Sequence, residues 1–183
     1  MHKAIFMDRD GTVSEEIGYM YDAGLYKVFS YAGPAIRKIN EHGMKAVLIT
    51  NQSGVGRGYF DEASIGKVHT ILQAELAAHQ AKLDAIYICP HHPDAGCDCR
   101  KPNPGMLLQA QRELDIDLTR SFVIGDKCID IETAHNVGAK GILVLTGYGQ
   151  EEREKYRTKE RQPDFIAEDL MGAVDAIISG VLA

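Results

Sequence analysis

Short apolar runs alternate with amphipathic segments along the whole chain. Each run is nearly continuous in apolar residues, and polar or small residues follow it. Strands of a parallel sheet that is covered on both faces show this pattern, so we expect buried strands here. The runs, of which the last is the shortest, are Lys3–Met7, Lys45–Ile49, Asp84–Ile88, Ser121–Ile124, Gly141–Leu145 and Asp164–Ile166.

Between these runs lie segments in which apolar residues have the spacing of a helix. Pro34 stands in the first turn of one such segment, and Gly43 is a natural stop after it. Asp61 is predicted to cap the N-terminus of the next helix. The polar stretch Gln150–Gln162 is predicted to be a solvated helix or a mobile loop. The predicted helices are Pro34–His42, Glu62–Gln80, Pro104–Leu114, Ile129–Asn136 and Leu170–Ser179.

Strands that alternate with helices predict an α/β fold with a doubly wound, Rossmann-like parallel sheet. The 183 residues suit one hydrophobic core, so we expect a single domain over residues 1–183. The gaps after the first two strands, Gly11–Gly33 and Asn51–Asp61, are expected to be loops, flaps or helix starts, because neither is large enough for a second domain.

The composition narrows the possible partners. Apolar residues make up 45% of the chain and charged residues 25%, which is ordinary for a soluble protein. The apolar stretches are too short to span a bilayer and the N-terminus lacks a secretory segment, so we expect a cytoplasmic protein with no membrane partner.

The net charge of the chain is −6, and it has no basic stripe, which argues against nucleic acid as a partner. An acidic enzyme with an anionic substrate needs local positive charge, which a divalent cation and a few Lys or Arg side chains supply.

Polar side chains gather at the predicted carboxyl ends of the strands, where doubly wound sheets bind their ligands. The segment Asp8–Thr12 follows the first strand, Thr50–Ser53 the second and Gly125–Lys127 the fourth. Asp8 and Asp10 are close enough for their carboxylates to repel each other. Ordinary packing gives no reason for such a pair, whereas a hard cation such as Mg²⁺ binds oxygen ligands of this kind.

Asp126 supplies a further carboxylate from a neighbouring strand end, and Asp130 follows it by four positions. Any one of these aspartates alone is more simply explained as the cap of a turn or helix. Their presence together at successive strand ends favours a site for a metal ion and a phosphate group.

Two further motifs are weak when each is taken alone. Thr50–Ser53 offers a hydroxyl and backbone N–H groups that can cradle phosphate oxygens, although an ordinary turn rich in Ser and Asn looks the same. Lys101 is a cation on a proline-flanked segment, and a solvated surface lysine is the alternative. Arg100 beside it can make a bidentate contact with a second anionic group.

The chain resembles the haloacid dehalogenase superfamily, whose four motifs it carries in order. These motifs are Asp8-x-Asp10-Gly-Thr, Thr50, Lys101 and Gly125-Asp126-x-x-x-Asp130. The resemblance covers nearly the whole chain. It implies the fold of that superfamily without a cap domain, and Mg²⁺-dependent hydrolysis of a phosphomonoester through an aspartyl phosphate.

The resemblance also implies a role for each motif residue. Asp8 is the nucleophile, and Asp10 is the general acid and base that serves the leaving oxygen and then the attacking water. Thr50 and Lys101 stabilise charge on the transferring phosphoryl group. The implied Mg²⁺ ligands are Asp8, the backbone carbonyl of Asp10, and Asp126.

One subgroup of the superfamily, which contains phosphatases of heptose bisphosphates and of histidinol phosphate, resembles the chain more closely. It implies a small phosphorylated sugar as the substrate, and we expect the protein to be a monomer. The implied reaction removes the 7-phosphate of D-glycero-D-manno-heptose 1,7-bisphosphate, a step towards nucleotide-activated heptose for surface polysaccharide. Hydrolysis of histidinol phosphate is the alternative, and a non-catalytic binding protein is a more distant one. The matching segments are DRDGT at Asp8–Thr12, Gly18-Tyr19, TNQSGVGRG at Thr50–Gly58, CPHHP at Cys89–Pro93, CDCRKPNPGM at Cys97–Met106 and GDK at Gly125–Lys127.

The same resemblance implies residues that bind the substrate. Arg100 is expected to contact the sugar or a second phosphate, Lys127 to contact the substrate, and a Glu16–Tyr19 flap to close over it. Asp130 is expected to orient Lys127 or its loop. The full implied set is Arg9, Glu16, Ile17, Gly18, Tyr19, Asn51, Gln52, Ser53, Arg100 and Lys127.

Clustered cysteines predict a second metal site. Three thiols and an imidazole are the ligands that Zn²⁺ favours, and four of them close a structural site. A loop of free cysteines, or a contact between Cys97 and Cys99, is the alternative. The zinc-binding loop of the subgroup selects His91 over His92. The predicted ligands are Cys89, His91, Cys97 and Cys99.

This zinc ion is expected to be structural, because no ligand position stays open for water. It would pin the loop that leads into Arg100 and Lys101. Cys128 lies outside the cluster and is expected to be a small buried hydrophobic residue.

Overall fold

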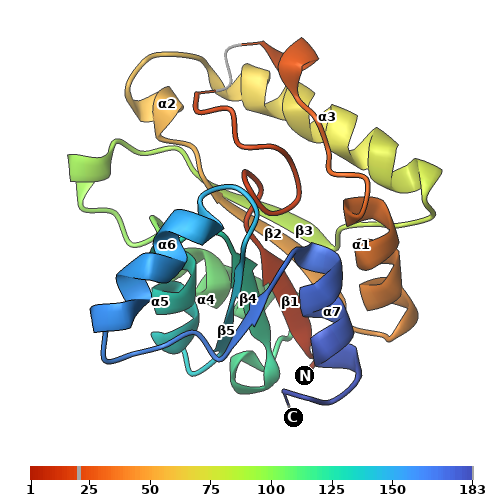
Figure 1. Ribbon diagram of the computed structural model, residues 1–183. Coiled ribbons are helices and arrows are strands. Elements are labelled where there is room, and N and C mark those ends of the chain that lie inside the picture. Colours follow the sequence, from red (N-terminus) through yellow and green to blue (C-terminus); the bar gives the residue numbers. More distant parts are fainter. Residues whose placement is uncertain (20–21, 183) are drawn as a thin grey trace.

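A computed structural model describes residues 1–19 and 22–182 of the chain. Its strands form one six-stranded sheet in which every neighbouring pair is parallel, in the order β3-β2-β1-β4-β5-β6 (Figure 1). The predicted doubly wound α/β fold is therefore confirmed. The strands are β1 (Ala4–Met7), β2 (Lys45–Asn51), β3 (Ala85–Cys89), β4 (Phe122–Gly125), β5 (Lys140–Val144) and β6 (Phe165–Ala167).

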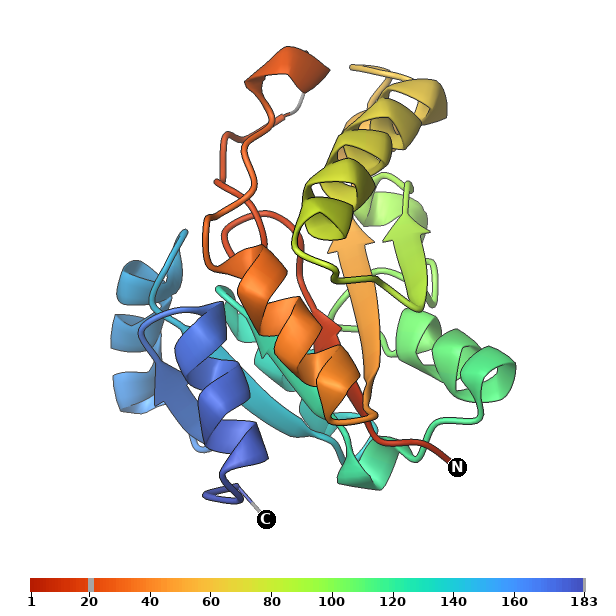
Figure 2. The ribbon, with the colours of Figure 1, turned by 90° about the vertical axis from the view of Figure 1, so that its right-hand side faces the viewer.

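Helices cover both faces of the sheet (Figures 1 and 2). One layer contains α1 (Ala32–Glu41), α3 (Glu62–Ala78) and α7 (Leu170–Ile178). The opposite layer contains α4 (Gly105–Leu114), α5 (Cys128–His135) and α6 (Gly149–Lys155). The short α2 is Ser53–Gly56, and 3-10 helices lie at Ala23–Leu25, Pro93–Ala95, Leu118–Arg120 and Tyr156–Thr158.

The central strand β1 shows how one short run serves both layers. Ile5 and Met7 pack in the core on the side of α1 and α7, whereas Ala4 and Phe6 pack in the core on the side of α4. All four side chains are fully buried. Successive side chains of a strand point to opposite faces, so a strand between two helical layers must be apolar at every position.

Every predicted strand and helix is present, and no end differs from its prediction by more than two residues. Asp61 caps α3 as predicted, because its carboxylate accepts a hydrogen bond of 2.9 Å from the Ser64 N–H. The prediction of a merely solvated stretch at 150–162 was only partly right. It holds α6 and a 3-10 helix, and Tyr156 is buried against Cys128 and Ile131.

Within residues 1–19 and 22–182, each helix is too short or too polar to span a bilayer.

Candidate active site

The site lies where the strand order changes direction. The chain builds β1, β2 and β3 towards one edge of the sheet and then places β4 on the other side of β1. The chain leaves β1 towards one helical layer and leaves β4 towards the opposite layer. This divergence leaves a crevice at the carboxyl ends of the two strands. Asp8 follows β1 and Asp126 follows β4, and the Asp8 N–H donates to the Ile124 carbonyl at 2.9 Å.

A cavity of about 350 Å³ opens at this edge. All four predicted catalytic residues line it: Asp8, Asp10, Thr50 and Lys101. The predicted substrate-binding residues that also line it are Glu16, Gly18, Tyr19, Asn51, Gln52, Ser53, Arg100 and Lys127.

Arg9 and Ile17 are placed differently from the rest of the predicted set. Neither lines the cavity. Arg9 is buried beneath it, with 1% of its side chain exposed, and Ile17 projects from the flap with 38% exposed. Their contact with a substrate therefore stays a prediction.

Three buried carboxylates converge beside the cavity. Oxygens of Asp8, Asp126 and Asp130 all lie within 4.8 Å of one another. Burial raises the pKa of Asp126 to about 8, and the negative charge of Asp8 adds to this effect. Asp126 Oδ1 is buried without a hydrogen-bond partner among the described residues, while Oδ2 accepts from the Tyr148 N–H at 2.9 Å. A small divalent cation with a preference for oxygen fits this donor set, because it supplies the charge that the buried oxygens lack.

Lys101 supplies part of the positive charge. Its Nζ lies 2.9 Å from Asp8 Oδ1 and 2.6 Å from Asp130 Oδ1. Burial opposes the charged form, but the two carboxylates outweigh it and raise the pKa of Lys101. One ammonium cannot neutralise three carboxylates, so the cluster keeps a net demand for cationic charge.

Two glycines let the backbone approach Asp126. A Cβ at Gly11 would lie 2.1 Å from Asp126 Oδ2, and a Cβ at Gly147 would lie 2.2 Å from the same oxygen. Both residues also have positive φ, +79° and +55°. Any larger residue would therefore displace the carboxylate or strain the backbone.

Asp10 lines the cavity but is not part of the described carboxylate cluster. Its carboxylate accepts two hydrogen bonds from Arg9, at 2.9 Å from Nε and 2.8 Å from Nη2. The Gln52 amide donates to Asp10 Oδ2 and to Thr50 Oγ1, both at 2.9 Å. The ends of β1 and β2 are thus joined by one network of side chains.

The flap after β1 reaches over the cavity. Glu16 Oε2 pairs with Lys127 Nζ at 2.9 Å, and Glu16 Oε1 accepts from the Gly18 N–H at 2.7 Å. Tyr19 meets Tyr59 edge-to-face, with ring centroids 4.8 Å apart. Residues 20 and 21 of the predicted 11–33 flap lie outside the described residues. The flap is therefore tied to Lys127 on one side and to the segment before α3 on the other.

The loop that carries Lys101 is clamped by β2. The Asn51 side chain donates to the Lys101 carbonyl and accepts from the Lys101 N–H, both at 3.1 Å. Arg100 lines the cavity, and its Nη1 is buried without a hydrogen-bond partner among the described residues. Asn51 thus fixes the backbone from which both cations project.

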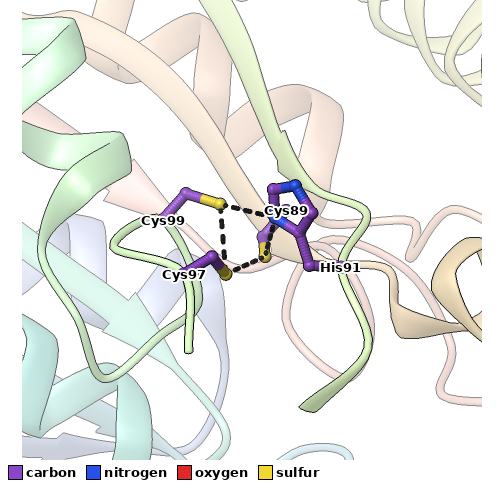
Figure 3. Close-up of side chains that lie close together, drawn as sticks. All are labelled: Cys89, His91, Cys97 and Cys99. Atoms are coloured by element: carbon purple, nitrogen blue, oxygen red, sulfur yellow. Dashed lines mark hydrogen bonds between the residues drawn. The ribbon is translucent and has the colours of Figure 1, made fainter. Parts of the chain in front are cut away.

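The predicted zinc ligands converge at the start of this loop (Figure 3). Cys97 Sγ lies 3.6 Å from both Cys89 Sγ and Cys99 Sγ, and His91 Nδ1 lies 3.2 Å from Cys99 Sγ. A tetrahedral zinc ion with bonds of about 2.3 Å to sulfur separates its sulfurs by about 3.8 Å. A disulfide would need about 2.05 Å, and all the cysteines are free. The four groups have the size and shape of a zinc site.

The thiols also need a cation in order to ionise together. Burial raises the pKa of Cys89, and burial and its thiol neighbours raise that of Cys99 to about 12. A metal that binds thiolates reverses this trend because it favours the deprotonated form.

The predictions from the sequence missed three features of the site or gave them too small a role. Asp130 was expected to orient Lys127 or its loop, and its Oδ2 does accept from the Lys127 N–H at 3.1 Å. It also pairs with Lys101, which spacing in the sequence cannot reveal. Ile129 and Tyr148 line the cavity as well. Tyr148 follows the end of β5, and this position at a strand end was the one available signal.

Comparison with known proteins agrees with this geometry. A family model described as HAD-hydrolase-like matches residues 98–173. The D-glycero-beta-D-manno-heptose-1,7-bisphosphate 7-phosphatase of Photorhabdus laumondii subsp. laumondii is 45% identical over 79% of this chain and 81% of that protein. The corresponding phosphatase of Thermosynechococcus vestitus is 40% identical over 95% of this chain and 94% of that protein.

A solved structure extends the likeness to three dimensions. The D,D-heptose 1,7-bisphosphate phosphatase from B. bronchiseptica, complexed with magnesium and phosphate, superposes with a TM-score of 0.90. Its sequence is 33% identical, and the match covers 97% of this chain and 99% of that one.

Proposed function

Because the chain belongs to the heptose-1,7-bisphosphate 7-phosphatase family of HAD-like hydrolases, we propose that it removes the 7-phosphate of D-glycero-D-manno-heptose 1,7-bisphosphate. It is a phosphoric monoester hydrolase. The observation that carries the proposal is the buried cluster of Asp8, Asp126 and Asp130 beside the cavity, in which Lys101 pairs with Asp8 and Asp130. This arrangement suits a divalent cation and a phosphate group together.

Asp8 is the proposed nucleophile. The Arg9 N–H and Lys101 Nζ reach Asp8 Oδ1 at 2.8 and 2.9 Å, which fixes the carboxylate next to the cavity. One of its oxygens forms a bond to phosphorus while the bond from phosphorus to the sugar oxygen breaks. A positioned nucleophile lowers the entropic part of the barrier.

Asp10 is the proposed acid and base. Its carboxyl group gives a proton to the departing sugar oxygen, and the resulting carboxylate then accepts a proton from water. That water attacks phosphorus, the bond from phosphorus to Asp8 breaks, and inorganic phosphate leaves. Lys101 and Thr50 donate hydrogen bonds to the phosphoryl oxygens during both transfers.

Mg²⁺ is the proposed catalytic ion, held by Asp8, Asp126 and the backbone carbonyl of Asp10. When bound, it supplies positive charge to the nucleophile and to the phosphoryl oxygens. Asp126 Oδ1, which is buried and has no hydrogen-bond partner in the described part of the chain, supports this assignment. Zn²⁺ is the proposed ion of the cysteine cluster, where it would have a structural role.

The cations of the cavity favour a bisphosphate over histidinol phosphate. Arg100 and Lys127 line the cavity in addition to Lys101. Burial works against the charged form of Lys127, yet Asp126, Asp8 and Glu16 raise its pKa, so it stays cationic. Arg100, whose buried Nη1 has no hydrogen-bond partner among the described residues, suits a second phosphate. The amine of histidinol phosphate would instead need an anion, and Glu16 is already paired with Lys127.

A panel of substrates with a phosphate-release readout tests the proposal. It contains heptose 1,7-bisphosphate, heptose 7-phosphate and histidinol phosphate, each assayed with Mg²⁺ and after its removal. We expect kcat/KM to be largest for the bisphosphate and to fall at least about tenfold when the 1-phosphate is absent, because a charge-assisted contact is lost. Removal of Mg²⁺ should abolish turnover. A larger kcat/KM for histidinol phosphate would transfer the assignment to that reaction.

A further inference from the structure

Arg9 is a charged residue that the fold buries almost completely, with 1% of its side chain exposed. It stands between Asp8 and Asp10 in the sequence but does not line the cavity. A buried guanidinium is costly unless it is paired and hydrogen-bonded. Its position therefore argues for action through a neighbouring group rather than through the substrate.

That neighbouring group is the Asp10 carboxylate. Arg9 Nε and Nη2 donate to Asp10 Oδ1 and Oδ2 at 2.9 and 2.8 Å, which is the two-pronged geometry of an Arg–carboxylate pair. Two parallel bonds fix both the plane and the direction of the carboxylate. Gln52 adds a third bond, to Oδ2 at 2.9 Å.

Arg9 is itself held in place from several sides. Its carbonyl accepts from the N–H groups of Val13 and Ser14, at 2.9 and 3.0 Å, so the loop after β1 closes around it. Its guanidinium carbon lies 5.8 Å from the centroid of the Tyr26 ring. His69 of α3 lies near it, and burial and the charge of Arg9 lower the pKa of His69 to about 4, so the two groups do not repel at neutral pH.

The catalytic scheme gives this rigidity a purpose. A free carboxylate two residues after Asp8 would be drawn towards a dication bound at Asp8 and would then be unable to exchange protons with the substrate. In the structure the Asp10 carboxylate is not part of the described carboxylate cluster of Asp8, Asp126 and Asp130. The hydrogen bonds described for this carboxylate come from Arg9 and Gln52.

We propose that Arg9 is a positioning residue that keeps the Asp10 carboxyl group out of the carboxylate cluster and directed at the leaving-group side of the cavity. This inference rests on the proposed function, in which Asp10 serves as acid and base. It replaces direct contact with the substrate as the role of Arg9.

The test compares two substrates that differ in their need for a proton. The sugar oxygen of heptose 1,7-bisphosphate is a poor leaving group and needs the acid, whereas p-nitrophenolate leaves well without one. The quantity to compare is kcat/KM, because it covers the steps up to departure of the leaving group and not the later hydrolysis of the aspartyl phosphate. The variants are Arg9→Met and Arg9→Lys. Arg37→Met, an exposed site on α1 bonded to Glu41, is the matched control.

We expect Arg9→Met to lower kcat/KM for heptose 1,7-bisphosphate by about 100-fold or more, which is the typical contribution of a general acid to the rate. For p-nitrophenyl phosphate the expected decrease in kcat/KM is less than about tenfold. Arg9→Lys keeps the buried charge but cannot form both hydrogen bonds to Asp10. Its decrease in kcat/KM for the bisphosphate, relative to that for p-nitrophenyl phosphate, should lie between those of the wild type and Arg9→Met. If Arg9→Met does not fold, Arg9→Lys decides. The control should match the wild type with both substrates. Equal losses with both substrates in the Arg9 variants would mean a merely structural role and overturn the proposal.

Crystal structures of the same variants separate this proposal from the proposed function. Rotation of Asp10 towards Asp8 in Arg9→Lys supports the positioning role, and an unmoved Asp10 overturns it. Hydrolysis of neither substrate by the wild-type protein would overturn the proposed function instead. The orientation of Asp10 would still decide what Arg9 does.

Discussion

Lys101 governs the balance of charge in the cavity. Its ammonium lies between Asp8 and Asp130, and each of these contacts is under 3 Å. Burial makes an unpaired charge costly, so the lysine and its two carboxylates depend on one another. A dianionic phosphate that enters the cavity would meet this ammonium and the proposed cation at the same place. The side chains at the floor are thus arranged for a phosphate group before any substrate binds.

His69 is predicted to weaken the fold in mild acid. Burial and the charge of Arg9 lower its pKa from 6.5 to about 4. The unfolded chain takes up the proton near pH 6.5 and the folded protein only near pH 4, so stability is complete above pH 6.5 and falls as the pH drops between these values. The expected loss of unfolding free energy from this group between pH 7 and pH 5 is about 2 kcal/mol.

Urea unfolding at pH 7 and pH 5 measures this effect in the wild type and in His69→Phe, which keeps a ring but cannot titrate. The variant should lose about 2 kcal/mol less than the wild type over that interval. The same pH dependence in both proteins would show that His69 is not its source.

Single positions were predictable to different degrees. The aspartates at the strand ends carried their own signal, because carboxylates that repel each other have few reasons to be adjacent. The role of Arg9 was not visible, since the sequence does not show whether a side chain points into the cavity or beneath it. The pairing of Asp130 with Lys101 joins residues on two separate segments and depends on the folded geometry alone.

The loop between β3 and α4 connects the cysteine cluster to the cavity. Cys99 directly precedes Arg100 and Lys101, and Asn51 of β2 clamps the Lys101 backbone. The Asn103 amide also donates to the Cys97 carbonyl at 2.9 Å. A metal ion that ties the two ends of this loop together would limit the positions that Lys101 can adopt.

Loss of the cluster is therefore predicted to impair catalysis at a distance. Cys97→Ser should remove bound zinc, lower Tm, and reduce kcat/KM by roughly 10- to 100-fold, because small displacements of Lys101 are costly. Elemental analysis, thermal unfolding and kinetics measure these effects. Cys128→Ala is the matched control, because Cys128 packs in a separate apolar cluster and should leave the zinc content unchanged. Full activity in a zinc-free Cys97→Ser protein would contradict the link between the two sites.

The periodicity of the sequence was enough to predict the strands and the long helices, because burial on one or both faces requires apolar residues at regular positions. It was not enough for α2 and the 3-10 helices, which are too short to show a period. In the 150–162 stretch, Tyr156 is one buried ring among charged neighbours. A single anchor of this kind does not produce an amphipathic pattern.

The topology of the whole sheet decides where the chemistry occurs. The order β3-β2-β1-β4-β5-β6 puts the change of direction between β1 and β4, and the aspartates after these two strands meet there. Both faces of the same sheet carry apolar cores. We therefore propose that residues 1–183 form one domain, in which the flap over the cavity does the work of a cap.

The flap and the loop after β3 both contribute residues to the lining of the cavity. Glu16 on the flap is joined to Lys127 after β4, and Arg100 faces the same cavity from the other loop. In the proposed mechanism, these two segments would limit the access of bulk water to an aspartyl phosphate at Asp8. The molecule as a whole is thus suited to two successive displacements at one phosphorus atom.

The most direct test of this account is to trap the phosphoryl group on the enzyme. In Asp10→Asn, p-nitrophenyl phosphate should still phosphorylate Asp8, because its leaving group needs no acid, but hydrolysis should stall without a base. Peptide mass spectrometry after acid quench in the presence of Mg²⁺ should find one added phosphoryl group on the peptide that contains Asp8. The double variant with Asp8→Asn should show none. A phosphoryl group on another residue, or turnover that persists in Asp8→Asn alone, would contradict the central claim.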